Sequence, residues 1–144
     1  MKKLLVLNGP NINMTGIREK DIYGSASYTE LVSMIKKWCS EAGFKADVHQ
    51  SNYEGKLIDI IQKSERKGYS GIIINPGAYS HYSIAILDAL LCVSIPKIEV
   101  HISDVANRED FRKNLITAKA CNSVISGKGY EGYRLAINEI SKLL

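Results

Sequence analysis

The sequence has few of the features that mark exported, membrane-spanning or metal-binding proteins. Its three cysteines, Cys39, Cys92 and Cys121, are odd in number and widely spaced, which argues against a disulfide framework or a zinc site. They are predicted to be reduced, buried thiols. No apolar run approaches the ~20 residues of a membrane-spanning helix, and the apolar stretch at residues 4–7 is too short for an export signal. We therefore expect a cytoplasmic protein that does not bind membranes.

The charges form no block of one sign. The 19 basic residues are interspersed with 15 acidic residues, so the net charge of +4 indicates a solvated surface rather than a nucleic-acid interface. The sequence also lacks a P-loop, a paired-glycine dinucleotide motif and a G-x-S-x-G elbow. With 45% apolar residues, the 144-residue chain can bury the core of one domain, over residues 1–144.

Short apolar runs alternate with helical patterns along the chain. The predicted strands are residues 3–7, 45–50, 70–75, 97–103 and 122–126, and the predicted helices lie within residues 27–43, 55–68, 76–93, 107–115 and 130–144. This alternation predicts a parallel sheet covered by helices on both faces. We therefore predict an α/β, flavodoxin-like doubly wound fold with strand order 2-1-3-4-5. In such folds ligands bind at the carboxyl ends of the strands, between the first and third.

A long loop, residues 9–27, follows the first predicted strand. Strand-to-helix connections usually have ~2 to 6 residues, so its length indicates a function. The loop contains Arg18 and Tyr23. A phenol, with an ordinary pKa of ~10, becomes a base near neutrality only where a group such as a nearby cation stabilises the phenolate. The alternative is that Tyr23 only packs the loop onto the sheet, and the local pattern does not decide between the two.

The fourth predicted strand carries an imidazole and a carboxylate on one face. Period-two alternation places Glu99 beside His101, an arrangement that orients a general acid and keeps it protonated. A structural ion pair would have the same pattern. The next residues, Ile102 and Ser103, offer backbone N–H groups and a hydroxyl that suit a carboxylate ligand.

Cations follow this strand. Arg108 and Arg112 are four residues apart on a predicted short helix, so they would share a face available to an anion. Glu109 and Lys113 are expected to form a separate exposed pair, which would free the arginines. The same spacing also fits an ordinary surface.

The third predicted helix has two polar candidates. His81, near its start, is expected to contact a ligand or to cap the helix, and Asp88 lies two turns further, where it can reach a subunit contact. We expect no metal site from His49, His81 and His101, because their spacing does not fit one.

Five stretches together resemble the type II 3-dehydroquinate dehydratase (3-dehydroquinase) family of the shikimate pathway: "LNGPNINMTGIREKDIYG", "QSNYEGKLID", "NPGAYSHYSIAILDAL", "KIEVHISDVANREDFR" and "ISGKGYEGYRLA". The likeness covers essentially the whole chain, in order. It implies reversible anti dehydration of 3-dehydroquinate to 3-dehydroshikimate through an enolate, without metal or organic cofactor. It also implies a homododecamer, a tetramer of trimers.

The resemblance implies catalytic roles for five residues. Tyr23, as tyrosinate, would remove the C2 proton, and Arg18 would be its activating cation. Asn11 would hold a water that stabilises the enolate oxygen. His101 would protonate the departing C1 hydroxyl, oriented by Glu99.

The resemblance also implies substrate-binding positions. Ile102 and Ser103 would bind the substrate carboxylate, and Asp88 resembles a residue that completes the site of a neighbouring subunit. The remaining binding positions are Asn75, His81 and Arg112.

Four residues depart from the family pattern without removing a catalytic group. They are Lys20, Tyr53, Tyr82 and Asp104, where proline, histidine, threonine and asparagine are common. They bear on closure of the loop, subunit packing and substrate affinity. The alternative function is a non-catalytic flavodoxin-like module for a flavin or phosphorylated ligand, although "NGPNINMTG" offers few hydroxyls for a phosphate.

Overall fold

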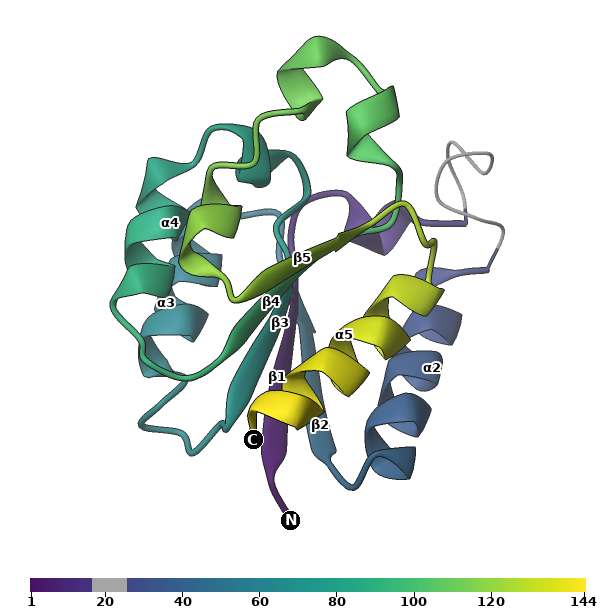
Figure 1. Cartoon of the computed structure of the whole chain (residues 1–144), viewed down its shortest axis with the longest axis vertical. Helices are drawn as coiled ribbons and strands as arrows, with labels where there is room; N and C mark the ends of the chain where they lie inside the picture. The colour runs from purple at the N-terminus through teal and green to yellow at the C-terminus, as the bar shows by residue number, and fades with distance from the viewer. Residues whose placement is uncertain (17–25) are drawn as a thin grey trace.

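A five-stranded parallel sheet forms the centre of the molecule (Figure 1). The structure is a computed structural model that describes residues 1–16 and 26–144. The strands are β1 (Lys3–Asn8), β2 (Lys45–Gln50), β3 (Gly71–Asn75), β4 (Lys97–His101) and β5 (Ser123–Ser126). Their order is β2-β1-β3-β4-β5 and every pair is parallel. The predicted doubly wound topology is therefore confirmed.

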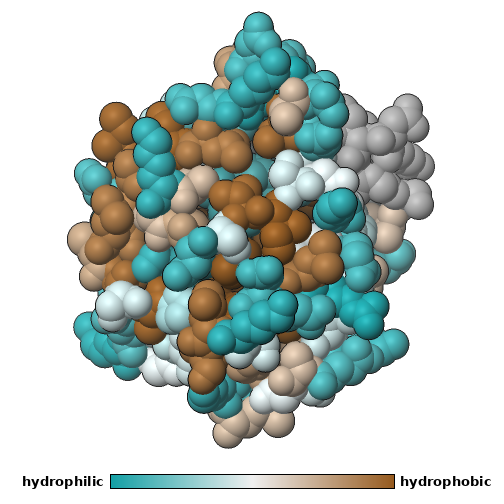
Figure 2. Space-filling model, viewed as in Figure 1, coloured by the Kyte–Doolittle hydropathy of each residue, from teal (hydrophilic) through white to brown (hydrophobic). Residues whose placement is uncertain are grey.

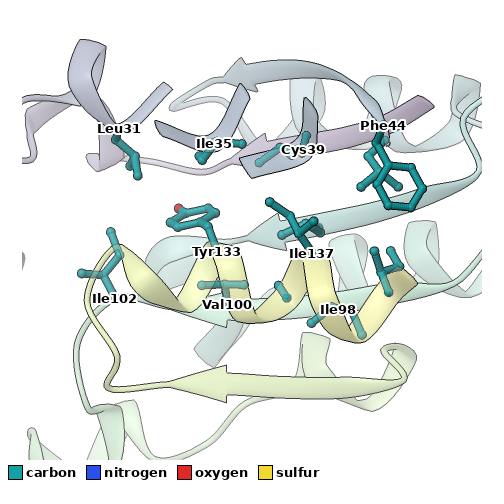
Figure 3. Close-up of a cluster of buried hydrophobic side chains, with 14 of the residues drawn as sticks. Leu31, Ile35, Cys39, Phe44, Ile98, Val100, Ile102, Tyr133 and Ile137 are labelled. Atoms are coloured by element: carbon teal, nitrogen blue, oxygen red, sulfur yellow. The ribbon is translucent and has the colours of Figure 1, made fainter. Parts of the chain in front are cut away.

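In the part of the chain that the structure describes, two α-helices cover each face of the sheet (Figure 1). The four are α2 (Tyr28–Glu41), α3 (Glu54–Lys63), α4 (Ile84–Leu91) and α5 (Glu131–Leu143). Helices α2 and α5 pack over one face around a cluster that includes Ile35 and Tyr133, shown in Figure 3. Helices α3 and α4 pack over the other face around Leu57 and Ile86. All residues of β3 and β4 are buried, as expected for strands covered on both sides.

The helix ends follow local capping chemistry. Ser27 caps α2, with its hydroxyl accepting from the Glu30 backbone N–H at 3.2 Å. Ser83 caps α4 in the same way, accepting from Ile86 N–H at 3.0 Å. Helix α3 ends at Lys63, five residues before the predicted stop at Gly68.

The predicted short helix over residues 107–115 is wrong. The structure has two 3-10 turns there, Val105–Asn107 and Asp110–Arg112, separated by extended backbone at Arg108 and Glu109. Most of this segment is exposed, so it has no apolar face whose burial would stabilise an α-helix. It forms the hydrophilic upper edge of the molecule in Figure 2.

The cysteine prediction is partly wrong. Cys39 is buried and Cys121 is partly buried, but Cys92 is exposed at the end of α4. In the described part of the chain, no helix is both long enough and apolar enough to cross a membrane.

Candidate active site

A cavity of about 120 Å³ lies at the carboxyl ends of β1, β3 and β4. Two loops that follow adjacent strands form one side of it. Gly9 after β1 donates its N–H to the Asn75 carbonyl at 2.7 Å, and a Cβ on Gly9 would lie 2.4 Å from the Pro76 carbonyl oxygen. Only glycine permits this approach. The cavity therefore lies at the switch point that the topology predicts.

The cavity brings together seven of the eleven predicted site residues. They are Asn11, Asn75, His81, His101, Ile102, Ser103 and Arg112. Glu99 does not line the cavity but contacts His101, which does. Asp88 is exposed on α4 and does not line the cavity. Arg18 and Tyr23 lie outside the described residues.

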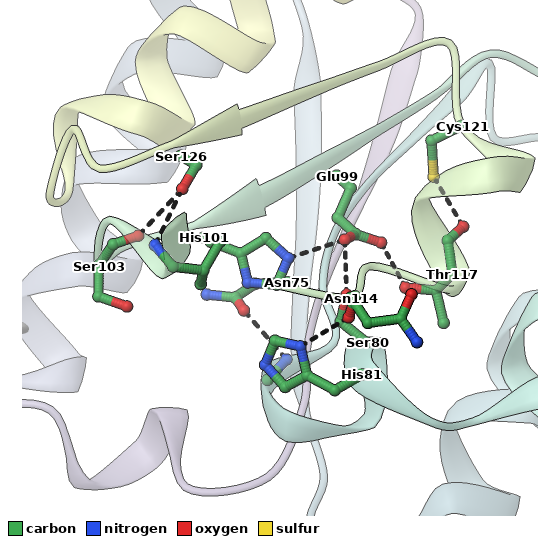
Figure 4. Close-up of polar contacts among 12 residues, drawn as sticks. Asn75, Ser80, His81, Glu99, His101, Ser103, Asn114, Thr117, Cys121 and Ser126 are labelled. Carbon is green, nitrogen blue, oxygen red and sulfur yellow. Dashed lines mark hydrogen bonds and ion pairs between the residues drawn. The ribbon is translucent and has the colours of Figure 1, made fainter. Parts of the chain in front are cut away.

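A buried carboxylate holds His101 (Figure 4). The His101 Nε2 lies 2.7 Å from Glu99 Oε2, and the two side chains are 5% and 0% exposed. Two hydroxyls also donate to the carboxylate: Ser80 to Oε2 at 2.8 Å and Thr117 to Oε1 at 2.5 Å. A buried carboxylate is costly unless donors satisfy it, and here three donor groups do so. The imidazole is therefore fixed in orientation beside a negative charge.

The second histidine, His81, stacks on His101 with 6.1 Å between ring centroids. Its Nδ1 lies 2.9 Å from the Asn114 carbonyl oxygen, which can only accept, so Nδ1 carries the hydrogen. Burial lowers the pKa of His81, and the neighbouring His101 and Arg112 lower it further. A neutral His81 therefore offers Nε2 to the cavity as an acceptor. Ser83 rather than His81 caps α4, so the expected ligand contact remains and the capping alternative is wrong.

Two asparagines contribute amides from the loops after β1 and β3. Asn75 is 2% exposed, and its Oδ1 accepts from Gly77 N–H at 3.1 Å. Asn11 adopts a left-handed backbone with φ 68°, a conformation that asparagine tolerates better than most residues. Its N–H donates to Asn52 Oδ1 at 3.1 Å, which fixes the loop.

The turn after β4 is held by the loop after β5. Gly129 N–H donates to the Ile102 carbonyl at 3.0 Å, and Gly127 N–H and the Ser126 hydroxyl donate to the Ser103 carbonyl at 3.1 and 3.2 Å. The Gly127 N–H also donates to the His101 carbonyl at 3.3 Å. The His101 and Ile102 carbonyls share their peptide groups with the Ile102 and Ser103 N–H groups, which are thereby fixed at the cavity wall and suit a carboxylate.

Two arginines make the cavity positively charged. Arg112 and Arg108 both line it, and Arg108 Nη1 lies 3.5 Å from the Ser103 hydroxyl. Arg112 pairs with Glu109, and the Arg112 guanidinium lowers the pKa of that carboxyl. The expected Glu109–Lys113 pair is wrong: Lys113 pairs with Asp110 at 3.0 Å, because the 3-10 turns bring residues three apart together.

Three residues of the site and its surroundings had no signal in the sequence. Ser80 and Thr117 contact Glu99, and Tyr133 of α5 contacts Asn75. Each pair is between 18 and 58 residues apart in the chain. Within residues 1–16 and 26–144, no three His, Cys, Asp or Glu side chains gather as metal ligands.

The fold and the cavity define a doubly wound α/β protein with a buried acid–base pair at a polar, positively charged ligand site. The chain belongs to the class II dehydroquinase family, because the model of that family matches residues 2–141. It is similar to the 3-dehydroquinate dehydratase of Caldicellulosiruptor saccharolyticus, with 51% identity over 100% of this chain and 99% of that one. The Thermotoga maritima 3-dehydroquinate dehydratase is 50% identical over 99% of this chain and 96% of its own length.

The fold is also that of a solved relative. The type II dehydroquinase of Butyrivibrio crossotus superposes with a TM-score of 0.94 and 51% identity, over 96% of this chain and 97% of the other. The family resemblance of the sequence is thus confirmed.

Proposed function

We propose that this protein catalyses the reversible dehydration of 3-dehydroquinate to 3-dehydroshikimate in the shikimate pathway. The observation that carries the proposal is the Glu99-bound His101 at the wall of a cationic cavity, in a chain of the class II dehydroquinase family. Elimination of water needs a base for the carbon acid, donors for the enolate and an acid for the leaving hydroxyl. The described residues supply the donors and the acid.

The reaction would begin with loss of the C2 proton, which is acidic because it lies beside the C3 ketone. Tyr23, as tyrosinate stabilised by Arg18, is our proposed base. The C–H electron pair moves into the enolate, whose oxygen meets a water held by Asn11. Return of this pair to the C1–C2 bond then expels the C1 hydroxyl as water.

His101 is our proposed acid for this departure. Its ring would deliver the proton that the leaving hydroxyl takes up, and the Glu99 carboxylate, 2.7 Å away, holds the ring in one orientation for this transfer. Every step uses side chains of the chain itself, so the proposal includes no metal or organic cofactor.

The remaining cavity residues are assigned to substrate binding. The peptide N–H groups at Ile102 and Ser103 would hold the carboxylate of 3-dehydroquinate, and the Arg112 guanidinium its hydroxyls. Asn75 donates from Nδ2, and His81 accepts at Nε2. The opposite polarities of these two groups would fix the ring in one orientation.

An assembly of subunits would complete the site. Asp88 is exposed on α4, and the same helix carries Ile84 and Leu91, which are 62% and 63% exposed. Positions 84, 88 and 91 are spaced by four and three residues, so their side chains share one exposed face of α4. We propose that α4 packs on a neighbouring copy within a homododecamer, a tetramer of trimers, in the cytoplasm. Light scattering would measure the mass of this assembly directly.

The activity is tested by adding 3-dehydroquinate and following the ultraviolet absorbance of the conjugated enone product. We expect turnover that persists after borohydride treatment with substrate present, because no lysine imine forms. Tyr23→Phe should fold normally and lose most of its turnover. Folded wild-type protein without turnover would refute the proposal, and a flavin or nucleotide retained on purification would favour the binding module instead.

A further inference from the structure

The cavity residue Asn75 belongs to a chain of hydrogen bonds that runs through the protein interior. Its Nδ2 donates to the Tyr133 hydroxyl at 3.0 Å, and this hydroxyl donates to Asn8 Oδ1 at 2.6 Å. Asn8 Nδ2 then lies 3.4 Å from the hydroxyl of Tyr28, the first residue of α2. We call Asn75, Tyr133, Asn8 and Tyr28 the amide relay. It links the ends of β1 and β3 to α5 and α2.

We propose that Tyr133 is a positioning residue, which acts through the amide relay to aim the Asn75 amide at the substrate. The inference rests on the proposed function, since it concerns the same cavity. Tyr133 does not line the cavity, so its effect on a ligand must pass through Asn75.

The direction of the relay is fixed at one end by the backbone. The Gly77 N–H can only donate, so the atom of Asn75 that faces it must be the carbonyl oxygen Oδ1, at 3.1 Å. The nitrogen Nδ2 therefore faces Tyr133. Because Nδ2 donates to the Tyr133 oxygen, the Tyr133 hydroxyl hydrogen is available to donate to Asn8 Oδ1. Asn8 Nδ2 in turn donates to the Tyr28 hydroxyl, so all three hydrogen bonds point from Asn75 towards Tyr28. One Nδ2 hydrogen of Asn75 is left for a ligand in the cavity.

Burial makes this arrangement stiff. Tyr133 and Asn8 are each 0% exposed and Asn75 is 2% exposed, so water cannot replace a lost partner easily. Figure 3 shows the Tyr133 ring among apolar side chains that include Leu31 and Ile35 of α2. Burial raises the pKa of the Tyr133 phenol, which keeps it protonated and able to donate. Aligned hydrogen bonds also polarise one another, so loss of one weakens its neighbours.

A double-mutant cycle between Tyr133→Phe and Asn75→Ala tests the proposal. Tyr133→Phe removes only the hydroxyl, and we expect it to lower kcat/KM roughly tenfold, mainly through KM, because the buried Nδ2 loses its acceptor. In the Asn75→Ala background the same change should lower kcat/KM by less than about twofold, because the residue through which Tyr133 acts is gone. A purely structural Tyr133 would lower kcat/KM by the same factor in both backgrounds.

Tyr69→Phe is the matched control. Tyr69 is also a buried tyrosine, and its hydroxyl donates to Asp47 Oδ2 at 2.6 Å, away from the cavity. We expect this variant to keep the wild-type kcat/KM. If Tyr133→Phe does not fold, Tyr28→Phe at the partly buried end of the relay takes its place in the cycle, with a smaller loss that also vanishes in Asn75→Ala.

A crystal structure of Tyr133→Phe tests the amide relay independently of activity, because it shows the orientation of the Asn75 amide. We expect the Asn75 amide to leave its single orientation, whereas an unchanged Asn75 would overturn the proposal. Additive effects in the cycle, or a wild-type kcat/KM in Tyr133→Phe, would also overturn it. Inactive wild-type protein would instead refute the proposed function, and the Asn75 orientation would still decide the relay.

Discussion

Two acidic side chains contact basic side chains at the same cavity, and their surroundings are opposite. Glu99 is 0% exposed at its side chain and meets His101, which is 5% exposed. Glu109 is 52% exposed and meets Arg112, which is 25% exposed. Glu99 also accepts from Ser80 and Thr117, and it lies on the fully buried strand β4. Glu109 precedes a 3-10 turn in the exposed segment after β4.

The contrast shows which contact is prepared for chemistry. In the interior the effective dielectric is low, so the charge of Glu99 acts strongly on His101 and its donors hold it in place. At the surface, water and salt screen Glu109, and Arg112 can leave it for a substrate at little cost. We infer that the Glu99–His101 pair governs the chemical step, whereas the Glu109–Arg112 pair affects binding only.

The largest effect is expected from removal of the buried imidazole. His101→Ala eliminates the proposed acid, and general acid catalysis typically contributes ~10²–10⁴-fold to a rate. We expect kcat to fall by this amount, with a much smaller change in KM. Steady-state kinetics on 3-dehydroquinate measures both, and circular dichroism checks that the variant is folded. A fall of less than about threefold would exclude His101 as the acid.

A smaller effect is expected from the buried carboxylate's hydroxyl partners. Thr117→Val keeps the side-chain shape and removes one donor from Glu99, which should destabilise the fold by about 1–3 kcal/mol. Urea unfolding followed by fluorescence measures this loss, and kcat should also decrease. Unchanged stability would mean that the Thr117 bond contributes nothing to the buried pair.

Acid sensitivity tests the histidine beside the buried pair. Burial holds the pKa of His81 below its ordinary value of 6.5, so the unfolded chain takes up a proton first as the pH falls. The contribution of neutral His81 to stability is therefore present above pH 6.5 and is lost as the pH falls below 6.5 towards the lower folded value. We expect His81→Gln to lose less stability than wild type between about pH 7 and 5.5. Urea unfolding midpoints at the two pH values measure the loss of stability. An equal loss in wild type and His81→Gln would contradict the lowered pKa of His81.

The smallest effect is expected at the exposed pair. Glu109→Gln removes a screened charge, so we expect kcat to stay at the wild-type value and KM to change by about two- to threefold at most. The change should disappear at high salt. Arg112→Ala is the informative companion, because loss of the guanidinium itself should raise KM more than loss of its partner. A tenfold fall of kcat in Glu109→Gln would remove the distinction between the two pairs.

The sequence supports the buried pair better than the exposed one for a physical reason. Period-two alternation along a strand is a short-range rule, so it correctly predicts that Glu99 and His101 lie together. Helical spacing over residues 107–115 needs an apolar face to bury, and the segment has none. The sequence therefore wrongly predicts a Glu109–Lys113 pair, whereas Glu109 contacts Arg112. The alternation of strands and helices predicts a parallel sheet, and five strands in a chain of 144 residues suit the order 2-1-3-4-5 that the structure has.

Contacts between distant segments could not be predicted from local pattern. Tyr133 sits at a position that local pattern marks only as part of the apolar face of α5, and its partner Asn8 is 125 residues away. Nothing in the local sequence distinguishes Ser80 and Thr117 from ordinary polar residues, because their contact with Glu99 forms only in the folded chain. The roles proposed for Arg18 and Tyr23 come from the family resemblance. Both residues lie outside the described part of the chain.

The most direct test is Glu99→Gln, measured in the same assay as Glu109→Gln. Glutamine can keep a hydrogen bond to His101 but carries no charge, so the change isolates the electrostatic effect of the buried carboxylate. We predict that kcat falls roughly ten- to a hundredfold in Glu99→Gln and stays at the wild-type value in Glu109→Gln. Equal kcat values for the two folded variants would contradict the account.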